Sequence, residues 1–185
     1  MATVTATRPT ATVQGPAAHR IWGTTRIALG LIFLWAFFDK LLALGFATGR
    51  AEDGSIDFLG PAAWINGGSP TYGFLTYATK GPFAEFFQGL AGQAWVDWVF
   101  MLGLLGIGVT LTFGIAVRLG AYAGVVLLML MWLAVLPPTY NPLLDDHIIY
   151  SLVLLGLAAV NAGDSLGFGK RWASLPIVER YPILR

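Results

Sequence analysis

Long runs of apolar residues alternate with short polar segments along this chain. Four of the runs approach the length of about 20 residues that a helix needs to cross a lipid bilayer, and charged residues are rare within them. The pattern predicts an all-α fold: an integral membrane four-helix bundle with a long outer loop that carries short interfacial helices. The predicted spans cover residues 24–46, 98–117, 119–136 and 142–162.

The segments between the spans predict how the helices connect. Only a short polar join at Arg118 separates the second span from the third, so these two helices are expected to form an antiparallel hairpin. Pro137 follows the third span and ends it, because proline cannot donate a helical hydrogen bond. Asn141 followed by Pro142 predicts the start of the fourth helix, since asparagine caps free amides and proline fits the first helical position.

The outer loop, residues 47–95, is too long and too aromatic for a simple linker. Pro82 opens a stretch in which apolar residues recur at helical spacing, which predicts an amphipathic helix. The residues at this spacing are Phe83, Phe86, Phe87 and Leu90. We expect the loop to cover the outer end of the bundle as a lid.

The flanking segments differ in composition from the membrane domain, residues 21–163. Residues 1–20 are rich in Thr, Ala and Pro and lack a continuous apolar run, which predicts a disordered cytoplasmic tail. Residues 164–185 combine Lys170 and Arg171 with Trp172, Leu175 and Ile177, which predicts a tail on the inner membrane surface.

Charge sets the predicted orientation. Only 11% of the residues are charged, against about a quarter in soluble proteins, so lipid must cover much of the surface. An inside N-terminus puts eight basic residues inside and two, Arg50 and Lys80, outside, which predicts a multi-pass cell-membrane protein with both termini cytoplasmic. The eight are Arg8, Arg20, Arg26, Arg118, Lys170, Arg171, Arg180 and Arg185.

The composition also excludes several kinds of site. The chain has no cysteine, which rules out disulfides, thiolate metal sites and iron–sulfur clusters. Its two histidines, His19 and His147, are predicted to lie on opposite membrane sides, so they cannot ligate one haem. The net charge of +1 gives no electrostatic reason to expect a nucleic-acid partner.

Two polar clusters in the predicted outer half are candidate sites. Asp39 and Lys40 lie about 10 Å below the outer end of the first span, where an ionisable group is costly and is a functional candidate. They are predicted to bind substrate; alternatively, Lys40 extends its ammonium to the interface and Asp39 meets a polar neighbour.

The second cluster begins the fourth helix. Asp146, His147 and Tyr150 share one helix face and could exchange protons near neutral pH, which makes them the predicted catalytic residues. Asn141 and Asp145 are predicted to help bind substrate. The alternative is that the acids only stabilise the helix dipole. No metal is expected, because three consecutive residues do not converge on a helix.

Several segments resemble the DoxX/DoxD family of membrane proteins. The similarity covers about residues 24–162 and is carried by Arg26, Gly30 and Lys40, by the segments 79–84 and 106–111, and most of all by the segment 141–150. The DoxD branch is known as the large membrane subunit of thiosulfate:quinone oxidoreductase, which also has a small subunit. The resemblance implies that Lys40 and the segment 145–150 line the site.

Three functions remain open from the sequence. The first is the membrane subunit of a quinone-linked oxidoreductase that passes electrons from a substrate such as thiosulfate to a membrane quinone. The second is a non-enzymatic scaffold or assembly subunit that docks partner proteins through its outer loop and basic tail. The third is a small-solute transporter, against which the small number of helices argues.

The chain is also expected to form homo-oligomers or to associate with a small subunit. One question that decides among these functions is whether the first and fourth helices touch, because Asp39 or Lys40 could then meet Asp146 or His147.

Overall fold

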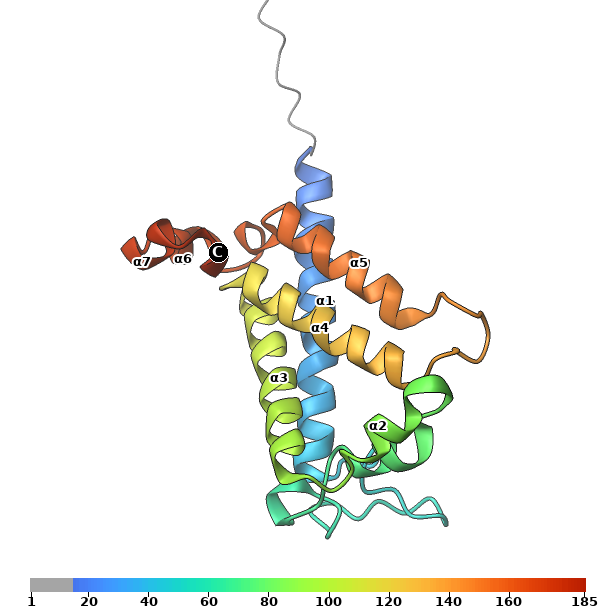
Figure 1. Ribbon diagram of the computed structural model, residues 1–185. Helices are drawn as coiled ribbons and strands as arrows, with labels where there is room; N and C mark the ends of the chain where they lie inside the picture. The colour runs from blue at the N-terminus through green and yellow to red at the C-terminus, as the bar shows by residue number, and fades with distance from the viewer. Residues whose placement is uncertain (1–14) are drawn as a thin grey trace, which may run out of the picture.

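The computed structural model describes residues 15–185, which contain helices and no β-strand; a single antiparallel bridge joins Arg50 and Ile56. The four long helices are α1 (Pro16–Leu42), α3 (Ala94–Phe113), α4 (Val117–Ala134) and α5 (Asp146–Ala159) (Figure 1). The short helices are α2 (Ala84–Gln88), α6 (Gly169–Ala173) and α7 (Pro176–Arg180). The predicted all-α class is confirmed.

Helix α1 begins earlier than the sequence predicted. The proposed disordered tail covered residues 1–20, of which 1–14 lie outside the described part of the chain, while residues from Pro16 onward are helical. Proline at the first helical position needs no hydrogen-bond acceptor for its nitrogen, and Ala17 and Ala18 are strong helix formers. The helix ends at Leu42 rather than Phe46, because Ala43 takes a left-handed conformation with φ 57°.

The long helices pack as two pairs. Helix α1 lies along α3, and α4 lies along α5, with the second pair inclined to the first (Figure 1). A tight turn at residues 114–116 joins α3 to α4 in the predicted antiparallel hairpin. A methyl group on Gly120 would clash with the Thr110 hydroxyl oxygen, so glycine lets α4 approach α3 closely here.

Three of these helices, α1, α3 and α4, are long and apolar enough to cross a membrane, which indicates a multi-pass protein in a lipid bilayer. The predicted fourth span, 142–162, is shorter in the structure. Helix α5 has 14 residues, about 21 Å at the usual rise per residue, against a hydrocarbon core of about 30 Å. It nevertheless returns along α4, so the described N-terminal and C-terminal segments lie toward the same end of the helices (Figure 1).

We call the two ends of the helices the Arg26 end and the Lys40 end, after two residues of α1. The main core runs between them and is contributed by all four long helices. Its fully buried side chains include Met101 and Leu111 of α3 and Leu154 and Leu157 of α5. This apolar interior holds two charged groups, Arg26 and Asp39, that are almost completely inaccessible to solvent.

Arg26 ties three segments together at its end of the bundle. The guanidinium donates to the carbonyl oxygens of Leu111 and Thr112 (3.0 Å to the latter), in the last turn of α3. These oxygens have no partner within their own helix, and the negative end of the helix dipole favours a cation there. The same side chain donates to three carbonyls beyond α5, those of Ala162, Ser165 and Leu166, at 3.0–3.2 Å.

At the Lys40 end, two buried carboxylates hold the long loop in place. Asp39 accepts hydrogen bonds from the backbone amides of Phe46 (3.0 Å) and Ala47 (2.9 Å), one on each oxygen. Asp97, in the first turn of α3, accepts from the Ser69 hydroxyl at 2.9 Å and from the amide and hydroxyl of Thr71. The loop is therefore fixed to both α1 and α3 by charge-assisted hydrogen bonds.

The loop contains short helices, as the sequence predicted. It includes 3₁₀ turns at Trp64–Asn66 and Gly81–Phe83 and a π-helical turn at Phe74–Ala78, followed by α2. The amphipathic face predicted after Pro82 is wrong in detail. Helix α2 ends at Gln88, before Leu90. The predicted residues also do not share one buried face, because Phe87 is buried against Leu75 and Ala134 whereas Phe86 is 65% exposed.

We predict that Arg26→Met lowers the free energy of unfolding by about 3 kcal/mol or more, because several buried carbonyl groups lose their donor. Unfolding in detergent, followed by circular dichroism, measures this. Arg26→Lys should recover only part of the loss, since an ammonium has fewer donors than a guanidinium. Arg20→Met, on the exposed surface of the same helix, should change stability by no more than about 0.5 kcal/mol.

We further predict that Asp39→Ala and Asp97→Ala each release a different part of the loop. Hydrogen exchange should accelerate at the amides of Phe46 and Ala47 in the first variant and at Thr71 in the second, because each amide loses its acceptor. Glu52→Ala, an exposed acid of the same loop, is the matched control. Unchanged exchange at these amides would show that the carboxylates do not hold the loop.

Candidate functional site

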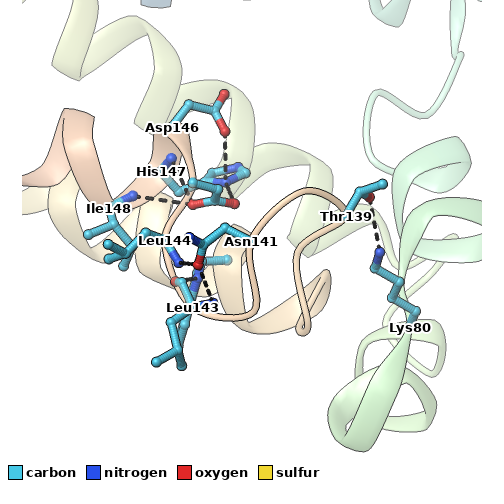
Figure 2. A network of polar contacts seen from close by, with 10 residues as sticks. Lys80, Thr139, Asn141, Leu143, Leu144, Asp146, His147 and Ile148 are labelled. Atoms are coloured by element: carbon cyan, nitrogen blue, oxygen red, sulfur yellow. Dashed lines mark hydrogen bonds and ion pairs between the residues drawn. The ribbon is translucent and has the colours of Figure 1, made fainter.

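The segment that joins α4 to α5 is a structured loop rather than the predicted helix start. The Asn141 side chain accepts hydrogen bonds from the amides of Leu143 and Leu144, both at 2.9 Å, which makes a tight turn (Figure 2). The Trp132 indole, in the last turn of α4, donates to the Leu143 carbonyl at 3.0 Å. Asn141 therefore shapes this loop, and the prediction that it caps a helix beginning at Pro142 is wrong.

Asp145 is the residue that caps α5. Its backbone is extended, and its carboxylate oxygen Oδ1 accepts from the amides of His147 (3.1 Å) and Ile148 (3.4 Å). The first turn of a helix has amides without partners, and a carboxylate before it satisfies them while complementing the helix dipole. The cap fixes where α5 begins and thereby where His147 lies.

The second Asp145 oxygen, Oδ2, lies 2.8 Å from Nδ1 of His147. An ionised carboxylate can only accept, so the shared hydrogen belongs to Nδ1, and the other ring nitrogen, Nε2, has no hydrogen-bond partner within residues 15–185. The two side chains are 16% and 17% exposed, which shields their contact from water while keeping the imidazole accessible. The arrangement is that of an oriented imidazole able to accept or release a proton at Nε2.

The other predicted catalytic residues lie near this pair without a hydrogen bond to it. Asp146 is 71% exposed, and its Oδ1 lies 3.6 Å from Nδ1 of His147, close enough for an ion pair with a protonated imidazole. Tyr150 is 37% exposed and, within residues 15–185, its hydroxyl bonds to neither Asp146 nor His147. Asp145, predicted only to help bind substrate, is the direct partner of the imidazole.

A buried hydroxyl one turn further along α5 was missed by the sequence analysis. Ser151 is 5% exposed, and its Oγ has no hydrogen-bond partner among residues 15–185. It lies four residues after His147 and so falls on the same side of the helix. A polar residue at this spacing in an otherwise apolar helix is the signal that could have identified it.

The three consecutive residues also come closer together than predicted. The ligand atoms of Asp145, Asp146 and His147 lie within 4.8 Å of one another, because Asp145 precedes the helix and its side chain folds back over the first turn. The geometric premise behind the expectation of no metal was therefore wrong. The Asp145 oxygens are nevertheless occupied by N–H donors, and the positive end of a helix dipole disfavours a cation. The groups fit an oriented histidine better than a metal ion.

The first predicted cluster has a different character. Both oxygens of Asp39 hold loop amides, so this side chain has a structural role in the fold. Lys40 is half-buried, with Nζ 6.0 Å from the centre of the Phe100 ring of α3. Within residues 15–185 no carboxylate lies within 4.0 Å of the Lys40 ammonium, so its charge is available to an anion.

The structure does not bring the two clusters together. Helices α1 and α5 approach each other at the Arg26 end, where Arg26 bonds to the Ala162 carbonyl and a methyl group on Gly156 would meet the Trp22 ring at 3.1 Å. Lys40 lies 14 residues further along α1, about 21 Å away. The start of α5 is well separated from that end of α1 (Figure 1).

Two hollows in the described part of the chain border neither cluster. One, of about 10 Å³, lies at the Arg26 end beside Arg118 and Asp164 and has room for a single water molecule. The other is an open apolar groove of about 200 Å³ between α3 and α4, lined by small residues such as Gly106 and Gly120.

Comparisons with protein-family models, curated proteins and solved structures find no match to this chain. They identify no family for this chain, so membership of the DoxX/DoxD family stays a prediction from the segments quoted above.

We predict that Asp145→Asn changes the tautomer of His147. An asparagine still caps the helix, but its NH₂ group can face Nδ1 only if that nitrogen becomes the acceptor, which moves the proton to Nε2. Nitrogen-15 spectra of labelled histidine test this, since the chain has two histidines and His19→Gln leaves one signal. Asp146→Asn, which changes an exposed acid next to the pair, should leave the tautomer unaltered.

Proposed function

We propose that the chain is the membrane subunit of a quinone-linked oxidoreductase and that its Asp145–His147 pair exchanges protons with the quinone headgroup. The observation that carries the proposal is the 2.8 Å contact, which holds the imidazole by Nδ1 and makes Nε2 the nitrogen available for proton exchange, on a side chain that is 17% exposed. A quinone dissolved in lipid carries its headgroup near the membrane interface, where the first turn of an apolar helix begins.

The proton balance defines what this pair does. Reduction of a quinone takes up two electrons and two protons to give the quinol. His147 supplies protons to the quinone oxygens from Nε2, one at a time, and regains each from water. The Asp145 carboxylate stabilises the imidazolium between these steps, and exposed Asp146 adds to the negative charge beside it. Tyr150, one turn further on, is proposed to contact the headgroup.

The electrons come from another molecule, because a histidine that exchanges protons supplies none and the chain has no cysteine that could be oxidised. In the proposed reaction two thiosulfate ions give one tetrathionate and two electrons. The free ammonium of Lys40 suits an anion of this kind. Because Lys40 and His147 lie apart, we propose that a partner subunit carries electrons from the thiosulfate to the quinone.

The non-enzymatic scaffold is the second candidate, and one observation favours it. The loop at the Lys40 end is held by two buried carboxylates yet presents large exposed aromatic side chains, among them Tyr77, Phe46 and Phe86 at 80, 67 and 65% exposure. A fixed apolar surface of this kind is typical of docking sites. A scaffold would bind its partner through this loop and would not need His147.

To distinguish the oxidoreductase subunit from the scaffold, we would follow quinone reduction in lipid nanodiscs on addition of thiosulfate, with and without co-purified partner proteins. His147→Gln should lower the rate by about a hundredfold or more, the usual contribution of a positioned acid–base group. Asp145→Asn should lower it less, and Lys40→Met should raise the thiosulfate concentration needed for half-maximal rate.

The matched control is His19→Gln, which removes the other histidine and should leave the rate unchanged. An active wild type whose rate does not depend on His147 would exclude the proton-exchange role. A chain that neither binds quinone nor supports turnover with its partner present, yet holds that partner through the loop, would establish the scaffold.

A further inference from the structure

The C-terminal segment from α6 to Arg185 forms a small unit that projects sideways from the Arg26 end of the helices (Figure 1). It folds on itself: Val178 of α7 is 3% exposed, and the Trp172 indole of α6 donates to the carbonyl of Leu184. Unlike the long helices, it contributes little to the main core. We call residues 169–185 the lateral tail.

Several polar contacts fix the height of the lateral tail relative to the helix ends. The Phe168 amide donates to the carbonyl of Phe113, the last residue of α3, at 2.9 Å. Arg118, in the first turn of α4, donates to the backbone of Pro182 (3.1 Å) and of Arg185 (2.9 Å). Arg185 in turn pairs with Asp164 at 2.7 Å. The tail therefore lies level with the ends of α3 and α4.

Helix ends of this length lie at the boundary between hydrocarbon and headgroups, so the lateral tail is held at headgroup depth. Its exposed side chains are apolar or positively charged, and both kinds are accommodated at this depth. Leu175, Ile177, Tyr181 and Ile183 are 41–57% exposed, so the lateral tail presents several apolar side chains on its surface. Apolar groups next to cations are the composition of interfacial segments.

The cations of the tail have no acidic partner. Lys170, Arg171 and Arg180 are exposed, and none has a carboxylate within 4.0 Å in residues 15–185. The one exposed acid of this unit is Glu179, while Asp164 is already paired with Arg185. Three free positive charges against one negative charge, at headgroup depth, match a surface of negative phosphates.

We propose that the lateral tail is a binding site for anionic phospholipid headgroups, in which Lys170, Arg171 and Arg180 contact the phosphates and the exposed apolar residues enter the acyl region. The buried contacts of Arg26 with Ser165 and Leu166 position the start of this segment. The site is distinct from the Asp145–His147 pair, which lies at the opposite ends of α4 and α5, and it does not depend on the proposed redox function.

A lipid-selectivity measurement on the full chain tests this. Because the sequence has no cysteine, Ser174→Cys gives a single labelling position within the tail for a fluorophore. In nanodiscs, we would compare quenching of this fluorophore by spin-labelled phosphatidylglycerol and by spin-labelled phosphatidylcholine at equal mole fractions. The anionic lipid should quench at least about threefold more strongly, and 0.5 M salt should reduce the ratio by screening.

The triple variant Lys170→Gln, Arg171→Gln, Arg180→Gln should bring the quenching ratio to about 1, whereas the charge-conserving variant Lys170→Arg, Arg171→Lys, Arg180→Lys should keep it. Glu179→Gln should raise the ratio. All these side chains are exposed, and melting temperatures confirm that the variants fold. A ratio of about 1 in the wild type, or one that the glutamine variant leaves unchanged, would overturn the proposal.

Discussion

The buried guanidinium of Arg26 is the contact on which the architecture depends. It satisfies carbonyl groups at the end of α3 and beyond the end of α5, so a single side chain of α1 joins three segments that are far apart in sequence. In a low-dielectric interior each of these carbonyls would be costly without a donor. Helix packing at this end, the path of residues 162–166 and the position of the lateral tail all follow from it.

The opposite end of the bundle uses charges of the opposite sign. Asp39 of α1 and Asp97 of α3 accept amide and hydroxyl hydrogens from the long loop, where Arg26 donates to carbonyl oxygens. The two acids lie on neighbouring helices of one pair, and their carboxylate oxygens hold the loop at two separate points. Buried charges in apolar helices are usually read as functional. In this protein Arg26, Asp39 and Asp97 have structural partners, whereas half-buried Lys40 has no carboxylate partner within residues 15–185.

The candidate proton-exchange site is built in a different way, from local sequence. Asp145 caps α5 by accepting the amide hydrogens of the residues two and three positions along, and it also contacts the ring of His147. The pair therefore requires no distant partner. Tertiary structure contributes the environment: the Trp132 indole of α4 fixes the preceding loop, and α5 packs along α4. A site of this kind can work on a bundle whose first and last long helices separate at that end, because its geometry is set within one turn.

The sequence by itself determined what short-range rules can determine. Apolar runs identified four helices, the polar join at Arg118 identified the hairpin, and the order Asp145-Asp146-His147 marked the polar start of the last helix. Helix ends were predicted less well: the first helix begins at Pro16 rather than near Thr24, and the last begins at Asp146 after the Asp145 cap rather than at Pro142. Only the tertiary structure decided the partners of Arg26, Asp39 and Asp97 and the separation of Lys40 from His147. The physical reason is that these partners depend on how the chain folds back on itself. The bonds of Arg26 join segments more than 80 residues apart, and those of Asp39 and Asp97 reach into an irregular loop, so neither kind leaves a periodic trace in the chain.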